Sequence, residues 1–261
     1  MCELLALNAN RPTDCRFSFK GLIRRGGVTC DHTDGWGLAS YEPDGSGVRI
    51  FREDEAAGFS PIAAHLAELN IISYSTIAHI RKATQGEVAL SNCHPFYRRW
   101  RGEDLIFAHN GDLKGAVPRA IEYEPLGDTD SEAAFCALLG RLDLIVNPEF
   151  PSLEILFPLI TEFCLEMHGL GTFNCLLSGG EWIFAFASTR LHCLTRSFPF
   201  SIAQLADADL TVDFSRETLE GDVVTVVSTE PLTSNEQWQQ LQPGEALLLR
   251  QGRIFLRHLP A

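Results

Sequence analysis

The second residue of the chain is a cysteine that opens an apolar run, Met1-Cys2-Glu3-Leu4-Leu5-Ala6-Leu7. Removal of Met1 would leave Cys2 with a thiol and a free α-amine on the same residue. An α-amine has a pKa of about 8 and can accept a proton near neutral pH, and a nucleophile activated by the terminal amine of its own chain is a known catalytic arrangement. Cys2 is therefore a candidate nucleophile. The alternative is that Cys2 is a small buried residue at the start of an edge strand.

A charged residue follows the next apolar strand. Residues 73–80 are rich in β-branched and aromatic side chains and predict a buried strand, which ends at Arg81-Lys82-Ala83-Thr84. An arginine in that position needs an anion, and its planar guanidinium fits a carboxylate through two parallel hydrogen bonds. Arg81 is therefore either a ligand for a substrate carboxylate or the partner of one of the many acidic residues of the chain.

A third candidate is Asn110-Gly111, which follows a strand predicted over residues 104–109. Asn-Gly is among the strongest sequence signals for a two-residue hairpin turn. The same dipeptide presents two neutral donors, the side-chain amide of Asn110 and the backbone N–H of Gly111, and such a pair can stabilise a developing oxyanion. The sequence leaves both interpretations open.

A fourth candidate is the carboxylate of Asp130, in a segment that predicts the start of a helix. Thr129 and Glu132 fit a capping box, and apolar residues at helical spacing follow them. Asp130 lies in the first turn, where its charge complements the helix dipole. Alternatively, it binds a substrate ammonium group.

Most of the elements that must position these residues are short strands. In chain order we expect them at residues 2–8, 34–41, 48–51, 73–80, 104–109, 172–178, 182–187, 191–195, 222–228, 246–250 and 254–257. The first is apolar enough to be buried on both faces. The three strands between residues 172 and 195 are expected to form one antiparallel meander, and the last two a hairpin.

Two more helices and one loop complete the prediction. Ser60 and Pro61 are typical of an N-cap and a first helical position. The buried stripe of that helix is expected to be Ile62, Leu66 and Leu69. A longer helix is predicted over residues 151–167, kinked or divided at Pro158, and the basic residues 98–101 are interpreted as a solvated loop. We expect one domain over residues 2–261, with two sheets and the helices outside them.

Composition limits the class of protein and of partner. The 261 residues are 45% hydrophobic and carry a net charge of −13, which disfavours nucleic acid and anionic membranes as partners. Without a secretion signal or an uninterrupted apolar span, a soluble cytoplasmic protein is expected. The eight cysteines are scattered singly, so reduced thiols are expected rather than disulfides. Their spacing fits no zinc site, and we expect neither a metal nor another cofactor.

In this order along the chain, the four candidate motifs resemble the class II glutamine amidotransferases, which are N-terminal-nucleophile hydrolases. The resemblance implies an α+β fold, the four-layer αββα sandwich with two mainly antiparallel sheets. Nearly the whole chain is similar to the small stand-alone, YafJ-like type. The segments that carry this similarity are Met1-Cys2-Glu3-Leu4-Leu5, Asp34-Gly35-Trp36-Gly37, Gly86-Glu87-Val88-Ala89-Leu90, Ala108-His109-Asn110-Gly111 and Val226-Val227-Ser228-Thr229.

The resemblance also implies roles for these residues. Cys2 would attack the side-chain amide of glutamine, while its own α-amine takes and returns the proton, and a γ-glutamyl thioester would form and be hydrolysed. Asn110 and Gly111 would stabilise the oxyanion. Arg81 would bind the substrate α-carboxylate and Asp130 its α-ammonium group. The residues expected to line the pocket are Thr84, Gly35 and Trp36, with Gly26, Gly27 and Gly37. Lys82 and Gln85 depart from the pattern of synthase-linked members.

Three functions remain open at this point. The first is a glutamine amidohydrolase that releases ammonia, either alone or for a separate synthase subunit. The second is an enzyme that uses the same nucleophile on another γ-glutamyl amide, such as a glutathione-like peptide, since stand-alone relatives include γ-glutamyl peptide hydrolases. The third is a catalytically idle regulatory or binding subunit on the same scaffold.

Overall fold

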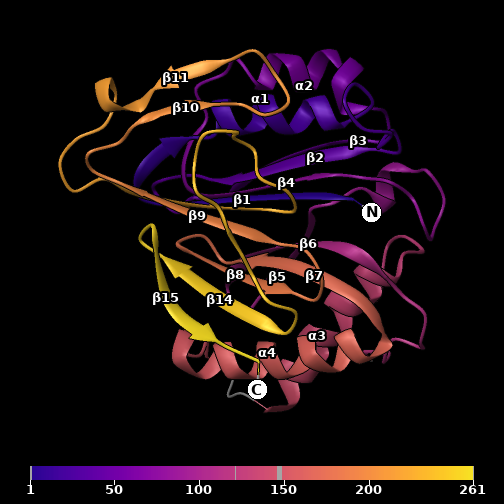
Figure 1. The fold of residues 1–261 in the computed structure, drawn as a ribbon. Helices are drawn as coiled ribbons and strands as arrows, with labels where there is room; N and C mark the ends of the chain where they lie inside the picture. Colours follow the sequence, from indigo (N-terminus) through magenta and orange to yellow (C-terminus); the bar gives the residue numbers. More distant parts are fainter. Residues whose placement is uncertain (1, 121, 146–148, 261) are drawn as a thin grey trace.

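The computed structural model describes residues 2–120, 122–145 and 149–260, so Met1, which we expect to be removed, lies outside the described residues. Two antiparallel sheets pack face to face, and helices cover both outer faces (Figure 1). The helices are α1 (Arg16–Arg25), α2 (Pro61–Leu66), α3 (Asp130–Ile145) and α4 (Leu153–Leu170). Helices α1 and α2 lie over one sheet, and α3 and α4 over the other. The expected α+β architecture, a four-layer αββα sandwich, is confirmed.

The larger sheet has seven strands in the order β13-β9-β12-β1-β4-β2-β3. Their bounds are β1 (Glu3–Asp14), β2 (Trp36–Tyr41), β3 (Val48–Glu53), β4 (Ile72–Ile80), β9 (His192–Ser197), β12 (Val223–Ser228) and β13 (Gln239–Gln240). Strand β1 is central and alternates between two cores. Its Leu5 and Leu7 pack under the α1 layer, whereas Leu4 and Ala6 pack between the sheets. The prediction that this strand is buried on both faces is confirmed.

The second sheet has six strands in the order β15-β14-β8-β7-β6-β5. Their bounds are β5 (Phe96–Trp100), β6 (Glu103–Leu113), β7 (Gly171–Ser178), β8 (Trp182–Ala187), β14 (Glu245–Arg250) and β15 (Arg253–His258). Apolar side chains of α3 and α4 bury its outer face. A two-stranded ribbon, β10 (Ile202–Gln204) and β11 (Thr211–Asp213), lies apart from both sheets. The short 3₁₀ turns are Ala57–Phe59, Leu90–Asn92 and Phe214–Arg216.

The predicted hairpins and the predicted helix cap are confirmed. The hairpins β2–β3 and β14–β15 form as expected. The Ser60 hydroxyl caps α2 by accepting a hydrogen bond from the Ala63 N–H at 2.9 Å. All eight cysteines are free thiols. No helix within the described residues is long and apolar enough to span a membrane.

Three strand predictions are wrong, each for a tertiary reason. Strand β9 does not continue the meander of β7 and β8, because the chain crosses between them to the other sheet, where β9 pairs with β12. Residues 98–101 are not a solvated loop. Most of them belong to β5, which places Trp100 in the core and Arg98 beside Glu132. Finally, β6 does not stop at Asn110-Gly111, because β7 offers a partner for both residues and the strand runs on to Leu113.

Two helix predictions also need correction. Helix α4 is not divided at Pro158, since one helix runs from Leu153 to Leu170 with the proline in its second turn. In α2, the buried residues are Ala63 and Leu66, while Ile62 is 49% exposed and Leu69 lies beyond the helix end. The helix is only six residues long, so a stripe extending to Leu69 could not form.

Candidate active site

The antiparallel pairing of β1 with β4 brings Cys2 and Arg81 together. Glu3 pairs with Ile80, so the residue before β1 lies beside the residues that follow β4. The Cys2 sulfur is 3.3 Å from both the backbone nitrogen and the backbone oxygen of Lys82. Cys2 is 8% exposed. Burial raises the pKa of the Cys2 thiol, and the Lys82 N–H and the Arg81 charge offset this in part. A thiol with a raised pKa needs a base before it can act as a nucleophile.

Asn110 reaches the same position from the facing sheet. Its side-chain nitrogen donates to the Cys2 carbonyl oxygen at 2.6 Å and to the Thr229 hydroxyl at 3.3 Å. Its side-chain oxygen is buried without a partner in the described part of the chain. Gly111 follows in β6, where a Cβ atom would lie 1.8 Å from the backbone oxygen of Thr172. Only glycine therefore fits at that point of the strand.

Arg81 is a buried cation held only by neutral groups. It is 2% exposed, and its guanidinium donates to the carbonyl oxygens of Asp34 at 3.4 Å, Gln85 at 3.2 Å and Gly86 at 3.4 Å. These are long for N–H···O bonds. No acidic side chain of residues 2–120, 122–145 or 149–260 forms an ion pair with it, so the alternative of an internal salt bridge is wrong for those residues. A buried guanidinium without a counter-charge can receive an anion.

Asp130 lies where β6 ends and α3 begins, and its carboxylate accepts a hydrogen bond from the Leu113 N–H at 2.8 Å. The Gln85 side chain bonds to the Leu113 carbonyl oxygen at 3.1 Å and to Asp112. Because Gln85 also holds Arg81 through its carbonyl oxygen, the arginine loop and the start of α3 are joined. Only half of the predicted capping box forms. Thr129 accepts from the Glu132 N–H, whereas the Glu132 carboxylate turns to Arg98.

The remaining predicted residues lie in different surroundings. Gly35 borders the site, because its carbonyl oxygen accepts from the Arg81 N–H at 2.7 Å, and its φ of 127° favours glycine. Thr84 is exposed in the loop after Arg81. The Trp36 indole is fully buried in the core under α1 and donates to Glu53 at 3.0 Å. The indole of Trp36 therefore points into the core, away from Cys2, Arg81 and Asp130. Only the backbone of Trp36 lies beside Gly35 at the site.

Sequence reasoning missed two groups that hold this arrangement. The Thr229 hydroxyl accepts from the Leu4 N–H at 2.9 Å as well as from Asn110. Arg25, 4% exposed, forms ion pairs with Glu3 and with Asp207, each at 2.8 Å. It also donates to the carbonyl oxygens of residues 230 and 231. The one available signal was Glu3 itself, since an acidic residue in a buried strand requires a partner.

The described residues do not meet the requirements of a metal site. No group of three or more His, Cys, Asp or Glu side chains among them is placed to hold a metal ion. The side chains that meet here are a thiol, a neutral amide donor, a buried cation and a carboxylate, and they come from the ends of β1, β4 and β6 and the start of α3.

Comparison with known proteins identifies the family. A family model described as "Glutamine amidotransferases class-II" matches residues 1–259. The Escherichia coli (strain K12) protein named "Putative glutamine amidotransferase YafJ" is 46% identical over 248 residues, which cover 94% of this chain and 96% of that protein. A crystal structure of a predicted glutamine amidotransferase from Pseudomonas aeruginosa PA01 has a TM-score of 0.78 at 43% identity, covering 98% of this chain and 100% of that one.

A more distant structure extends the likeness of the fold. Glutamine phosphoribosylpyrophosphate amidotransferase from B. subtilis has a TM-score of 0.57 at 16% identity, covering 95% of this chain and 47% of that one. At that identity the likeness concerns only the fold. Together with the match of the family model over nearly the whole chain, these findings show that the chain belongs to the class II glutamine amidotransferase family.

Proposed function

We propose that residues 2–261 act as one catalytic domain that hydrolyses the side-chain amide of glutamine through Cys2. The observation that carries the proposal is the buried, uncompensated guanidinium of Arg81 beside the Cys2 thiol. A substrate α-carboxylate supplies the missing negative charge. Asp130, which is half-buried at the start of α3, receives the α-ammonium group. Thr84 and the backbone of Gly35 and Trp36 border the bound amino acid.

In this mechanism the Cys2 sulfur attacks the amide carbon, and the α-amine freed by loss of Met1 takes the thiol proton. The amide oxygen becomes negatively charged and accepts hydrogen bonds from the Asn110 side chain and the Gly111 N–H. For this, the Asn110 amide must exchange its bond to the Cys2 carbonyl oxygen for one to the oxyanion. The C–N bond then breaks, and the proton passes to the leaving nitrogen as ammonia. Water hydrolyses the γ-glutamyl thioester to glutamate and restores the thiol.

The first experiment measures Met1 removal and turnover in the same preparation. Intact-protein mass spectrometry is expected to show that Met1 is absent, and Cys2→Ala is expected to abolish ammonia release from glutamine. A preparation that retains Met1 and turns over fully would refute the role of the Cys2 α-amine.

A second experiment tests substrate recognition by Arg81. Arg81→Lys replaces a two-pronged donor by a point charge, and loss of one hydrogen bond to a charged group costs about 1.5–3 kcal/mol, so KM is expected to rise about tenfold or more. Arg24→Lys, an exposed position one residue before Arg25, is the control and should change nothing. An unchanged KM for Arg81→Lys would make Arg81 structural.

The leaving group is identified by a substrate panel. Glutamine and γ-glutamyl peptides present the same α-carboxylate and α-ammonium groups, so the assay must measure released ammonia and released amine separately. Preference for glutamine supports ammonia supply, either as free product or to a separate acceptor subunit. Preference for the peptides would replace that substrate assignment while retaining Cys2 as the nucleophile.

A further inference from the structure

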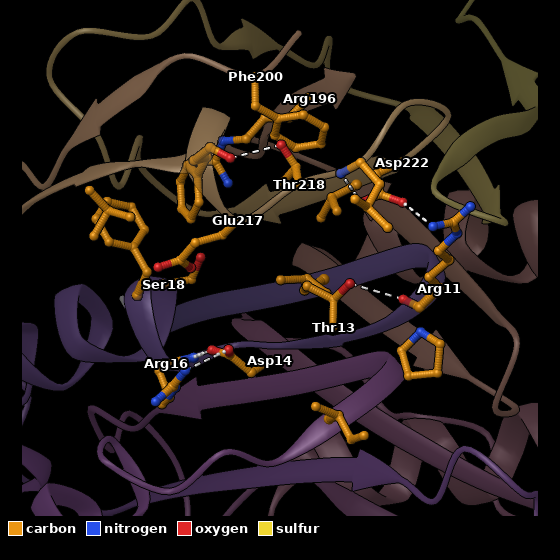
Figure 2. Close-up of a pocket in the computed structure, with 18 of the residues that line it drawn as sticks. Arg11, Thr13, Asp14, Arg16, Ser18, Arg196, Phe200, Glu217, Thr218 and Asp222 are labelled. Carbon is orange, nitrogen blue, oxygen red and sulfur yellow. Dashed lines mark hydrogen bonds and ion pairs between the residues drawn. The ribbon is translucent and has the colours of Figure 1, made fainter. Parts of the chain in front are cut away.

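A cavity lies at the far end of β1 from Cys2 (Figure 2). Its volume is about 440 Å³, within the range of small-molecule sites. The walls come from the end of β1, the first turn of α1, the start of β12 and the segment 198–222. Strands rise about 3.3 Å per residue, so Asn10 lies roughly 25 Å from Cys2 along β1. The cavity is therefore separate from the candidate active site.

The cavity exists because the outer helix layer is incomplete. Helices α1 and α2 have only ten and six residues, whereas α3 and α4, which cover the other sheet, have sixteen and eighteen. Segment 198–222, with its β10–β11 ribbon, covers part of the remaining face and leaves a gap against α1. The floor and wall of this gap are apolar and include Leu7, Val224, Phe200, Phe17 and Phe214. Such a surface accepts an apolar group of a ligand.

Nearly every polar side chain of the cavity is already paired within the protein. The pairs are Arg11 with Asp222, Arg16 with Asp14, Lys20 with Glu68, Arg196 with Glu236, Thr13 with the Arg11 carbonyl oxygen, Thr218 with the Phe214 carbonyl oxygen, and Asn10 with the backbone of Gly221 and Val223. All four cations therefore have their own acids. Two lining side chains, Ser18 and Glu217, form no hydrogen bond or ion pair with any described residue.

Ser18 and Glu217 point into the cavity from opposite walls, and both lie away from the Arg11–Asp222 pair (Figure 2). Ser18 is 4% exposed, and its hydroxyl forms no hydrogen bond with the described residues. The carboxylate of Glu217 lies close enough to α1 to help raise the pKa of Arg16, whose main cause is the hydrogen bond to Asp14. Free donor and free acid thus lie at the same end of the cavity.

The first turn of α1 supplies further donors beside Ser18. Its N-cap, Cys15, makes no side-chain capping bond, and the turn contains no acidic residue. The Arg16 N–H donates to Asp14 at 3.0 Å. The N–H groups of Phe17 and Ser18 have no acceptor among the described residues. Free N–H groups at a helix start favour a carboxylate or another small anion.

We propose that this cavity binds a free α-amino acid with an apolar side chain. Its carboxylate accepts hydrogen bonds from the first turn of α1 and from the Ser18 hydroxyl, and its ammonium group pairs with Glu217. Its side chain lies against Phe200 and Val224. The carboxylate of Glu217 would repel a simple anion, and the positive end of α1 would repel a simple amine. Only a ligand that carries both charges satisfies both groups.

Calorimetric titration of the full chain with L-phenylalanine tests the proposal. We expect saturable binding. 3-Phenylpropionate lacks the ammonium group, phenethylamine lacks the carboxylate and glycine lacks the apolar side chain. Each is expected to bind at least about fivefold more weakly, the effect of losing about 1 kcal/mol of interaction. Absence of binding at about 10 mM, where even a site with a Kd of 1 mM is filled, would overturn the proposal.

Single substitutions test whether L-phenylalanine binds in this cavity. Ser18→Ala and Glu217→Gln are each expected to weaken L-phenylalanine about fivefold. Neither should unfold the protein, since neither side chain has an internal partner. Glu220→Gln, exposed and outside the cavity, is the matched control for Glu217. Arg81→Lys should leave this affinity unchanged, which separates the cavity from the active site. Loss of binding in Arg81→Lys with retention in Ser18→Ala would assign the ligand to the active site and refute the cavity proposal. None of these measurements depends on Cys2 being a nucleophile.

Discussion

Acid is expected to destabilise this protein through a buried pair of histidines, His79 in β4 and His94. Their rings lie 4.2 Å apart, and the residues are 0% and 3% exposed. None of their four ring nitrogens has a hydrogen-bond partner within the described residues. Burial lowers the pKa of His79 to about 3, helped by the neighbouring charge of His109. Burial and the adjacent His79 lower the pKa of His94 well below its ordinary value.

The direction in which pH changes the free energy of unfolding follows from comparing the protons bound by the folded and unfolded states. An unfolded histidine binds a proton near pH 6.5, whereas these two remain neutral in the folded protein until the pH is far lower. The unfolded state therefore binds more protons below pH 6.5, and the free energy of unfolding falls as the pH falls. Each histidine contributes a slope of up to about 1.4 kcal/mol per pH unit, or about 2 kcal/mol between pH 6.5 and 4.5. Over this pH range the two histidines together lower the free energy of unfolding by about 4 kcal/mol. This is a large part of the 5–15 kcal/mol by which folded proteins are usually stable.

His79→Leu isolates this effect from the titration of carboxylates. The free energy of unfolding is measured by urea denaturation between pH 7.5 and 4.5. At pH 7.5 the variant should lie within about 1 kcal/mol of the parent, because no hydrogen bond is lost with the imidazole. Between pH 7.5 and 4.5 the free energy of unfolding of the variant should fall by about 2 kcal/mol less than that of the parent. His65→Leu, at an exposed position of α2, is the control and should keep the parent slope. Parallel pH profiles for parent and His79→Leu would refute the reasoning.

Two further substitutions test packing and charge at the site. Gly111→Ala places a Cβ atom 1.8 Å from a backbone oxygen of β7 and is expected to cost about 3 kcal/mol or more, measured by urea unfolding. Gly169→Ala, in α4 with open space around it, should instead stabilise by about 0.5–1 kcal/mol, and equal effects of the two would contradict the steric argument. Arg25→Met leaves Glu3 as a buried unpaired acid and should lower the thermal unfolding midpoint, with a cost of about 3–5 kcal/mol. Arg216→Met, 82% exposed, should cost less than about 1 kcal/mol, and a similar loss in both would show that burial does not decide the outcome.

The parts of the fold that could be predicted are those that local chemistry decides. The burial of β1 on both faces, the Ser60 cap and the last hairpin each depend on residues close in sequence. The errors concern choices of partner. Nothing near β9 says that it pairs with β12 in the other sheet rather than with β8. Asn110-Gly111 has the local signal of a turn, but pairing with β7 keeps it extended.

The candidate site shows the same division. The resemblance to a known family placed Cys2 and Arg81 in one site, and the structure brings them together through the antiparallel pairing of β1 with β4. The residues that support them could not be predicted. Thr229 is 225 positions from Leu4, and Arg25 is 182 positions from Asp207. Each of these contacts depends on how the sheets and their connecting segments pack, which no local pattern contains.

The two buried polar residues of β1, Glu3 and Asn8, explain why Cys2 has one defined position. Glu3 is anchored by Arg25. The fully buried Asn8 donates to Ser75 in β4 and to the Glu181 carbonyl oxygen, and it accepts from the Gly252 N–H in the β14–β15 turn. A slip of one residue in β1 would turn both side chains to the opposite faces and leave these groups unsatisfied. Because Asn8 binds loops of the second sheet, it also fixes β1 relative to the sheet that carries Asn110. The regular pairing of β1 with β4 shifts only after Asn8, where the strand runs on to the cavity lined by Ser18 and Glu217, so the end that carries Cys2 is the constrained one.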